Sequence, residues 1–246
     1  MTDRDATTRF ADRAQAYAAH RPGYPEPVFA ALFAGLGDPR DLVVADAGAG
    51  TGISTKALAQ RVREVVAIEP NAAMREQAEA AQNVRWVGGT AERTGLPASS
   101  VDIAAAFQAF HWFDPQRAWQ EFERIARRRI ALVQYERDET QPFAQAYART
   151  IRPFVLDDTE ALRLRAMEEF ERLAGSALVR TVVPSAQTLT LEGVLGRIAS
   201  SSYLPSQGDA ARELRDRAHA IFARHQSGGT VTMGMSIFVL TADRSG

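Results

Sequence analysis

The composition is that of an ordinary globular protein. The chain has 246 residues, 46% of them hydrophobic and 24% charged, and 29 Lys and Arg residues against 30 Asp and Glu residues leave a net charge of −1. This composition excludes global disorder and gives no electrostatic reason to expect binding to nucleic acid. The absence of cysteine excludes disulfides, thiolate metal sites and cysteine nucleophiles, and we predict no metal site. Because no apolar run suits a secretory signal or a membrane span, we expect a cytoplasmic protein without membrane contact.

The first half of the chain alternates short apolar runs with helix-like segments. After two expected helices at residues 7–19 and 25–35, we predict strands at 42–45, 65–68, 83–87, 101–107 and 130–133, and helices at 53–62, 71–81 and 114–126. Most of these runs are continuously apolar and do not alternate, which is typical of strands covered on both faces. Their alternation with helices predicts βαβ crossovers and a parallel sheet.

The pattern changes after residue 133. Apolar residues at helical spacing predict helix over about 138–175, followed by an extended segment at 181–190, helices at 191–200 and 209–225, and a last strand at 231–241. No internal repeat or low-complexity linker divides the chain. We therefore predict one α/β domain over residues 1–246, with a helical lead-in at 1–40 and a helical insertion at 138–178 after the fifth strand.

A glycine-rich turn, Asp-Ala-Gly-Ala-Gly-Thr-Gly at residues 46–52, follows the first predicted strand. Glycines at such a place let the backbone turn tightly and approach a ligand closely. A dinucleotide site would need glycine at position 53, where the chain has Ile53, and a phosphate loop would need Gly-Lys-Ser/Thr. Asp46 would also repel a pyrophosphate. The turn therefore predicts a ligand that carries positive charge or hydroxyl groups.

This turn resembles the first motif of the class I S-adenosylmethionine-dependent methyltransferases. Within that family the chain is similar to the small-molecule enzymes of methyltransferase type 11, the trans-aconitate-methyltransferase-like subfamily. The resemblance implies a Rossmann-like, seven-stranded, mostly parallel sheet with helices on both faces, and S-adenosylmethionine as the cofactor. It also implies that the cofactor contacts Asp46, Gly48, Ala49 and Gly50.

Glu69 and Pro70 end the next predicted strand, one βαβ unit after the glycine turn. An acid at the carboxyl tip of a strand faces the ligand crevice and can accept hydrogen bonds from two ribose hydroxyls. The alternative is a solvated carboxylate that caps the helix beginning at Asn71. Because an acid at a strand tip is not part of the core, we expect its removal to change stability little.

Residues 88–92, Gly-Gly-Thr-Ala-Glu, resemble the adenine-recognition stretch of the family, which is often Gly-Asp-Ala-Glu. Thr90 stands where many members have Asp. The resemblance therefore implies that adenine is contacted by backbone groups of Thr90 and Ala91, or by Glu92. The alternative is an ordinary loop.

The sequence Gln-Ala-Phe-His-Trp-Phe at residues 108–113 follows the fourth predicted strand and is similar to a pattern of the same subfamily. In this fold the exit loop of that strand meets the reactive methyl group. Gln108 would hold the methionine part of the cofactor. His111 could take a proton from a hydroxyl or amine substrate, since an unperturbed imidazole has a pKa of about 6.5. The alternative for His111 is hydrogen bonding within an aromatic wall formed with Trp112 and Phe113.

Residues 10–25 look like the helical lead-in of the same subfamily. In relatives this segment folds over the cofactor, which implies that Tyr17, Arg21 and Tyr24 approach its amino-acid end. The alternative is that these side chains only pack the lead-in helix on the sheet.

The resemblance implies methyl transfer to a small-molecule acceptor by in-line displacement, with O-methylation of a hydroxyl or carboxylate favoured. Residues 138–178 would roof the acceptor pocket or, alternatively, pack on the sheet edge. A nucleic-acid methyltransferase and a non-catalytic cofactor-binding protein are the competing hypotheses. The balanced charge counts against the first of them. The intact Asp46, Glu69 and glycines count against the second, although a fold does not prove activity.

Overall fold

The computed structural model describes residues 23–244, and these form two compact units. The sheet unit comprises residues 23–134, 160–183 and 238–244, and the helix unit comprises residues 135–159 and 184–237. The predicted helix at 7–19, with Tyr17 and Arg21, lies outside the described residues. The single domain over 1–246, with its lead-in at 1–40 and insertion at 138–178, stays a prediction.

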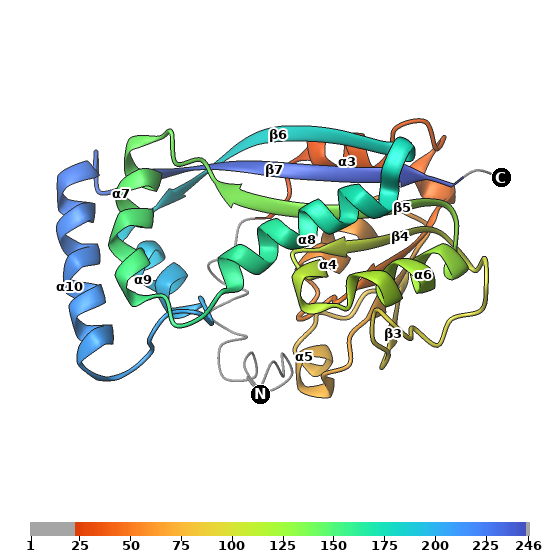
Figure 1. Ribbon diagram of the computed structural model, residues 1–246, viewed down its shortest axis with the longest axis horizontal. Coiled ribbons are helices and arrows are strands. Elements are labelled where there is room, and N and C mark those ends of the chain that lie inside the picture. Colours follow the sequence, from red (N-terminus) through yellow and green to blue (C-terminus); the bar gives the residue numbers. More distant parts are fainter. Residues whose placement is uncertain (1–22, 245–246) are drawn as a thin grey trace. The chain divides into compact units, whose positions relative to one another are not determined.

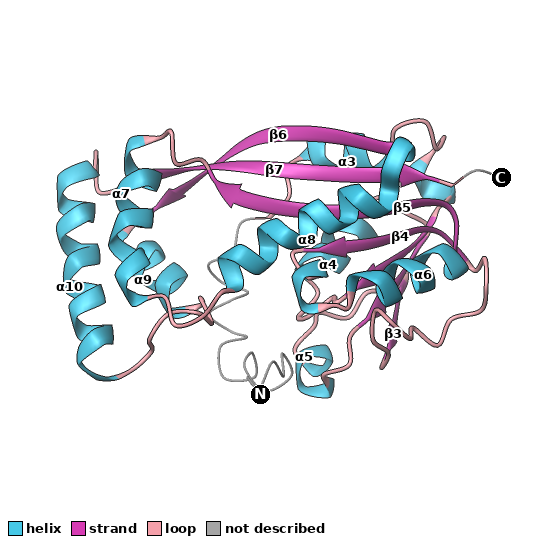
Figure 2. Cartoon of the chain, viewed as in Figure 1, coloured by secondary structure: helices cyan, strands magenta, loops and turns pink. Residues whose placement is uncertain are grey.

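Helices and strands follow the expected alternation (Figure 2). The sheet unit holds, in chain order, α3 (Glu26–Phe33), β1 (Val43–Ala47), α4 (Ile53–Ala59), β2 (Glu64–Ile68), α5 (Ala72–Glu76), β3 (Val84–Val87), β4 (Val101–Phe107), the 3-10 helix η3 (Phe110–Trp112), α6 (Pro115–Ile125) and α8 (Thr159–Ala174). The helix unit holds α7 (Pro142–Ile151), α9 (Leu191–Ala199) and α10 (Gly208–His225). Three long strands have residues in both units: β5 (Ala126–Arg137), β6 (Leu178–Leu189) and β7 (Val231–Asp243).

The strands form one seven-stranded sheet in the order β3-β2-β1-β4-β5-β7-β6 (Figure 1). Every pairing from β3 through β5 is parallel. β7 is antiparallel to β5, because Asp138 N donates to Gly234 O while Arg244 N donates to Arg128 O, so rising numbers on one strand meet falling numbers on the other. The Rossmann-like, mostly parallel sheet is therefore confirmed. Its strand order reverses at β1 and β4, the place where open α/β sheets bind ligands.

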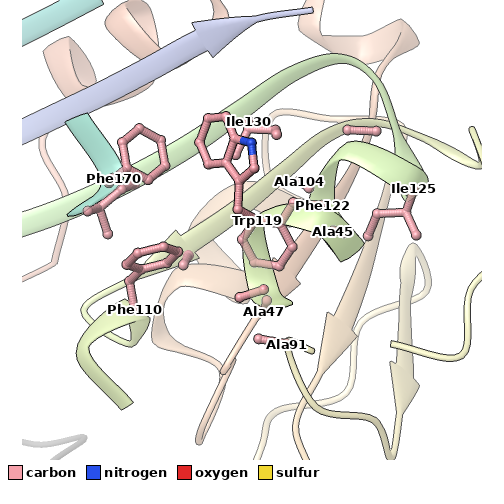
Figure 3. Packing of buried hydrophobic residues seen from close by; sticks show 14 of the residues in the cluster. Ala45, Ala47, Ala91, Ala104, Phe110, Trp119, Phe122, Ile125, Ile130 and Phe170 are labelled. Carbon is pink, nitrogen blue, oxygen red and sulfur yellow. The ribbon is translucent and has the colours of Figure 1, made fainter. Parts of the chain in front are cut away.

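The main core of the sheet unit lies between the sheet and helices α6 and α8 (Figure 3). Alternate residues of β1, among them Ala45 and Ala47, face this side, and Trp119 and Phe122 of α6 pack there with Phe170 of α8. Successive side chains of a strand point to opposite faces, so the intervening positions face α4 and α3. Helices on both faces explain why most positions of β1, β2 and β4 are apolar and buried, as is typical of a parallel sheet.

Charged residues extend β5 beyond the predicted 130–133. Arg127 and Arg129 fit in the strand because each binds a carboxylate: Arg127 pairs with Asp102 and Arg129 with Asp243. Arg129 is almost fully buried, and its ion pair offsets part of the cost of that burial. Hydrophobic runs alone underestimate a strand whose polar ends are paired by tertiary contacts.

Three helical predictions were too long by three residues or more. The helix expected over 53–62 ends at Ala59 in α4. The helix expected over 71–81 ends at Glu76, because only Met74 of α5 is buried and no apolar face stabilises further turns. The helix expected over 138–175 is divided into α7 and α8. Pro153 has no N–H to continue a helix after α7, and Asp157 accepts hydrogen bonds from the backbone N–H and hydroxyl of Thr159, which starts α8.

The helix unit has a small aromatic core of its own. Phe143 of α7 packs edge-on against His225 of α10, with ring centroids 5.9 Å apart, and is tilted against Tyr147 at 6.3 Å. Arg197 of α9 is buried and donates to Gln187 on β6. Within residues 23–244 no helix is both long and apolar enough to cross a bilayer.

Candidate functional site

The glycine turn between β1 and α4 has the backbone geometry that only glycine adopts freely. Gly48, Gly50 and Gly52 have φ values of +70°, +58° and +87°. A Cβ atom added to Gly48 would lie 2.6 Å from the Cβ of Ala109. A Cβ atom added to Gly50 would have as its nearest neighbour the methyl carbon of Met74, at 3.8 Å. The turn is therefore tightly packed at its first glycine and open at its second.

Asp46, the penultimate residue of β1, is completely buried. Its Oδ2 accepts hydrogen bonds from the hydroxyls of Ser54 (2.8 Å) and Thr55 (2.6 Å), the first turn of α4. Its Oδ1 has no hydrogen-bond partner among the described residues. Burial raises the pKa of Asp46 to about 6; the hydrogen bonds from Thr55 and Ser54 oppose this rise, and the negative charge of Glu69 adds to it.

Glu69, at the carboxyl end of β2, is held between the glycine turn and the start of α5. Its Oε2 accepts the N–H of Gly50 at 3.0 Å and its Oε1 accepts the N–H of Asn71 at 2.9 Å. The cap of α5 is instead the side chain of Asn71, which accepts from Ala73 N. At 7% exposure Glu69 is not a solvated acid. The expectation that its removal changes stability little is therefore revised, because removal leaves two backbone donors without their partner.

The loop after β3 is a tight turn over residues 90–93. The N–H of each end residue, Thr90 and Arg93, donates to the carbonyl of the other at 3.2 Å. Gly89 precedes the turn at a place where a side chain would lie 2.6 Å from the carbonyl oxygen of Thr94. Thr90, Ala91 and Glu92 are thus presented by a rigid backbone at the end of β3.

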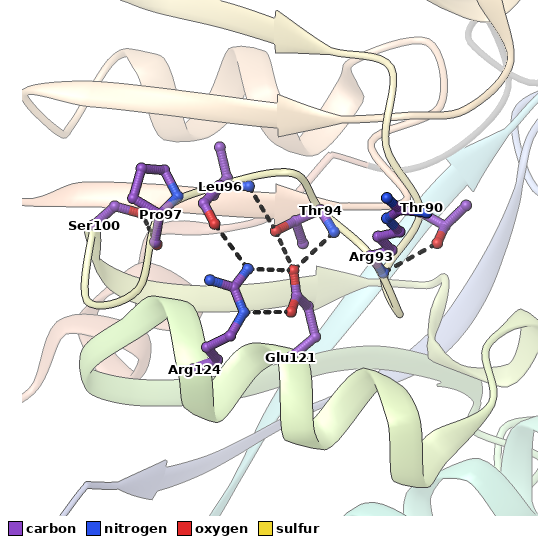
Figure 4. A network of polar contacts seen from close by, with 8 residues as sticks. All are labelled: Thr90, Arg93, Thr94, Leu96, Pro97, Ser100, Glu121 and Arg124. Carbon is purple, nitrogen blue, oxygen red and sulfur yellow. Dashed lines mark hydrogen bonds and ion pairs between the residues drawn. The ribbon is translucent and has the colours of Figure 1, made fainter.

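Sequence reasoning missed the residues that hold this loop (Figure 4). Glu121 of α6 accepts both the N–H and the hydroxyl of Thr94 and pairs with Arg124, which also donates to the carbonyl of Leu96. The guanidinium of Arg124 lowers the pKa of Glu121 to about 2; burial opposes the shift, and the two bonds from Thr94 add to it. A Glu–Arg pair three residues apart is common on exposed helices, so no sequence signal distinguished this one.

The segment after β4 begins with a strained residue. Gln108 has φ +56°, unusual for a residue with a side chain. Its backbone N–H (2.9 Å) and its side-chain Nε2 (3.2 Å) both donate to the carbonyl of Val133. The side-chain amide is thereby fixed with its oxygen as the remaining acceptor. Strain of this kind concentrates at functional sites.

His111 lies in η3, three residues after Gln108, and is half-buried. Its ring centroid is 4.9 Å from that of Trp112, with the planes tilted by 43°. This contact fits an aromatic wall and leaves the imidazole in the segment that follows β4, so both interpretations of His111 stay open. Tyr24 packs edge-on against Phe107 at 5.0 Å, which is the packing role; its approach to a cofactor stays a prediction.

The predicted site residues that the structure describes follow the carboxyl ends of neighbouring strands β3, β2, β1 and β4, with Tyr24 on Phe107 beside them. The set is Tyr24, Asp46, Gly48, Ala49, Gly50, Glu69, Pro70, Thr90, Ala91, Glu92, Gln108 and His111. Carboxyl ends of parallel strands meet at one edge, so these residues are gathered along it. Asp46, Glu69 and Glu92 place three carboxyl groups along that edge, which suits a ligand with hydroxyl groups or positive charge.

Known proteins are similar to this chain over the segment that carries these residues and beyond it. A family model described as "Methyltransferase domain" matches residues 45–133, which contain the glycine turn, Glu69 and His111. An uncharacterized methyltransferase of Mycobacterium tuberculosis is 32% identical over 229 residues, covering 90% of this chain and 88% of its own length. The chain belongs to the class I S-adenosylmethionine-dependent methyltransferases. It spans about half the length (47%) of another methyltransferase relative, from Dictyostelium discoideum.

Solved methyltransferase structures share the fold. A protein described as "a Putative Type II Methyltransferase", from Anaeromyxobacter dehalogenans, superposes with a TM-score of 0.66 at 24% identity, covering 91% of this chain and 97% of its own. A methyltransferase from Geobacter sulfurreducens, solved with S-adenosylhomocysteine, has a TM-score of 0.50 at 18% identity and covers 96% of this chain and 98% of its own. At these identities the likeness concerns the fold. The subfamily suggested by the sequence stays a prediction.

The residues of this methyltransferase fit the cofactor of its family. The N–H of Gly50 binds the carboxylate of Glu69, and a side chain on Gly50 would meet no heavy atom closer than the methyl carbon of Met74, at 3.8 Å. The buried Oδ1 of Asp46 and the hydroxyl of Thr51 have no hydrogen-bond partner among the described residues. Buried polar atoms without partners are rare in folded proteins and mark places where a ligand or water binds. Within residues 23–244, no group of three or more His, Asp or Glu is placed to hold a metal ion.

Proposed function

We propose that the protein binds S-adenosylmethionine at the carboxyl edge of β3, β2, β1 and β4, and methylates an oxygen of a small-molecule acceptor, a hydroxyl or a carboxylate. The observation that carries this proposal is Glu69. Its two carboxylate oxygens are fixed by the N–H groups of Gly50 and Asn71, and each oxygen keeps a lone pair for a ribose hydroxyl.

The other residues have roles that follow from their places along the edge. Backbone groups of Thr90 and Ala91 would meet the adenine, with Pro70 bordering the ribose. The fixed amide oxygen of Gln108 would accept a hydrogen bond from the ammonium group of the methionine part. The carboxylate of Asp46, buried at the end of β1, would stabilise the positive charge of that ammonium group. Tyr24, which packs on Phe107 beside this edge, would approach the same amino-acid end; Tyr17 and Arg21 lie outside the described residues, and their role rests on the resemblance alone.

The bound cofactor supplies an electrophilic methyl group on a sulfonium. The protein then has to orient the acceptor oxygen in line and exclude water, which can be worth up to about 7–11 kcal/mol. For a hydroxyl acceptor, the neutral imidazole of His111 takes the hydroxyl proton on a ring nitrogen. A carboxylate acceptor is already an anion and needs no base.

The balanced charge of the chain supports a small acceptor, because nucleic-acid enzymes carry a basic surface for the phosphate backbone. A cytoplasmic location stays a prediction from the sequence.

Titration calorimetry with S-adenosylhomocysteine and with NAD tests the cofactor. We expect a micromolar dissociation constant for S-adenosylhomocysteine and no measurable binding of NAD. A dinucleotide site would need glycine at position 53, and the carboxylate of Asp46 would repel a pyrophosphate. The reverse preference would overturn the proposal. The acceptor is tested by measuring the release of S-adenosylhomocysteine from S-adenosylmethionine in the presence of candidate acceptors. These are hydroxy acids, their O-methyl ethers (in which the hydroxyl is blocked), their esters (in which the carboxylate is blocked) and DNA. Turnover with DNA alone would refute a small-molecule acceptor.

A further inference from the structure

Glu92 makes a contact that the adenine-loop resemblance does not explain. It lies in the tight turn over residues 90–93, is half-buried, and its Oε1 accepts the backbone N–H of Asp114 at 2.9 Å. The two residues are 22 positions apart and follow different strands, β3 and β4. The carboxylate of the 90–93 turn therefore ties two loops of the site together.

Asp114 is the N-cap of α6. The side chain of an N-cap residue binds N–H groups of the first helical turn, but the backbone N–H of the cap residue itself needs an acceptor from elsewhere. The side chain of Asp114 accepts from Gln116 N and Arg117 N. In a capping box, a Glu or Gln three residues after the cap would return to bind the N–H of the cap residue. That position is Arg117, which cannot accept a hydrogen bond. Glu92 supplies the missing acceptor from another loop.

The segment between Gln108 and Asp114 carries His111 and is held at both ends. Gln108 is fixed to Val133 at one end, and Asp114 is fixed to Glu92 at the other. Between them, the ring of Phe113 lies 3.0 Å from where a side chain on Gly48 would begin. A change in the position of Glu92 would therefore shift the segment that carries His111 and, through Phe113, the packing at Gly48.

We propose that Glu92 is a positioning residue that links the 90–93 turn to the His111 segment, so that a cofactor bound at Thr90 and Ala91 steadies His111. This inference rests on the proposed function, in which those two residues meet the adenine. The bond has good geometry, with 2.9 Å between the backbone nitrogen and the acceptor oxygen, and its acceptor is a carboxylate. Glu92 acts on the reaction through its hold on Asp114, with no contact to the acceptor.

Hydrogen exchange of the backbone amides at residues 110–114, measured with and without saturating S-adenosylhomocysteine, tests the link without any acceptor. In the wild type we expect the ligand to slow exchange there by about tenfold, the lower range for a hydrogen bond to a charged group. Glu92→Ala should lose this protection, and Glu92→Gln, whose amide oxygen can still accept, should keep most of it. Glu123→Ala, an exposed glutamate on α6, is the matched control and should behave as the wild type.

Calorimetry on the same variants separates the link from a direct contact. The coupling free energy between cofactor binding and the ordering of residues 110–114 is the same in both directions. Glu92→Ala should therefore weaken S-adenosylhomocysteine binding by no more than the factor by which the ligand slows exchange at these residues in the wild type. A larger loss of affinity, with protection retained, would show that Glu92 touches the cofactor and would overturn the positioning role. Unchanged exchange in a wild type that binds the ligand would also overturn it. A wild type that does not bind the ligand refutes the proposed function itself, and this outcome is recognised from the calorimetry alone.

A backbone variant keeps the test independent of the folding of Glu92→Ala. Asp114 has φ −73° and ψ 109°, which proline adopts, so Asp114→Pro deletes the donor N–H. Asp114→Ala loses the same cap but keeps the N–H. We expect ligand-induced protection at Trp112 and Phe113 to be lost in Asp114→Pro and kept in Asp114→Ala. Equal protection in the two variants would refute the link.

Discussion

Replacing Glu69 by alanine tests the cofactor site and the local fold together. The change removes the acceptor of the Gly50 N–H (3.0 Å) and of the Asn71 N–H (2.9 Å) at a position only 7% exposed. Each donor left without a partner costs about 1–3 kcal/mol, less where water replaces the carboxylate. We therefore expect the free energy of unfolding to fall by about 2–4 kcal/mol and Tm to fall by roughly 5–15 °C.

The cofactor effect is measured on the folded variant. Loss of hydrogen bonds from two ribose hydroxyls to a charged group should weaken S-adenosylhomocysteine binding by about 1.5–3 kcal/mol, which is roughly 10- to 150-fold in Kd. Titration calorimetry well below the Tm of the variant gives this number.

Glu64→Ala is the matched control for Glu69→Ala. Glu64 starts the same strand, 40% of its side chain is exposed, and it forms a 3.4 Å ion pair with Arg85. A pair of this kind is worth at most about 1 kcal/mol, so Tm should change little and affinity should not change. Unchanged affinity in folded Glu69→Ala would remove Glu69 from the cofactor site. An unchanged Tm would refute its structural role.

Three further predictions concern titratable groups. The pKa of Asp46 is raised from 3.8 to about 6, so the folded state binds this proton more tightly than the unfolded state does. The free energy of unfolding should therefore fall by about 1–3 kcal/mol as pH rises from about 4 to about 6. Asp46→Asn should make the free energy of unfolding, measured by urea denaturation, less dependent on pH in this range. The pKa of Glu121 is lowered from 4.5 to about 2, so its contribution is present above pH 4.5 and is lost as pH falls toward 2; at pH 7 Glu121→Gln should be destabilised by about 1–3 kcal/mol, and an unchanged Tm would contradict this. With a hydroxyl acceptor, His111→Ala should lower the rate by roughly 10²–10⁴ at nearly unchanged cofactor affinity, and the wild-type rate should fall as the imidazole is protonated. A flat pH–rate profile with full turnover in the variant would refute His111 as the base.

Local patterns predicted the sheet unit well. Strands β1, β2 and β4 are short, mostly apolar runs next to turn residues, and β4 (Val101–Phe107) has the predicted limits. The glycine turn and the strand-tip Glu69 were found because close backbone approach needs glycine, and because the carboxyl ends of parallel strands form the ligand edge. Predictions of length failed where neighbours in space decided the outcome: β5 gains its arginines through Asp102 and Asp243, and α5 ends early because nothing packs on a longer helix.

The sequence by itself determined the fold class, because this depends on periodicity and on residue types at short spacing. The family and most of the expected site residues followed from the resemblance of the sequence motifs to those of known methyltransferases. The tertiary structure decided what those residues do for one another. Glu69 accepts an N–H 19 positions away, Glu92 one 22 positions away, and Glu121 one 27 positions away. A carboxylate carries no sequence mark of which distant backbone donor it will meet. That choice is made only when the packed sheet and helices bring particular loops within hydrogen-bond distance, because a buried donor or acceptor must then find a partner.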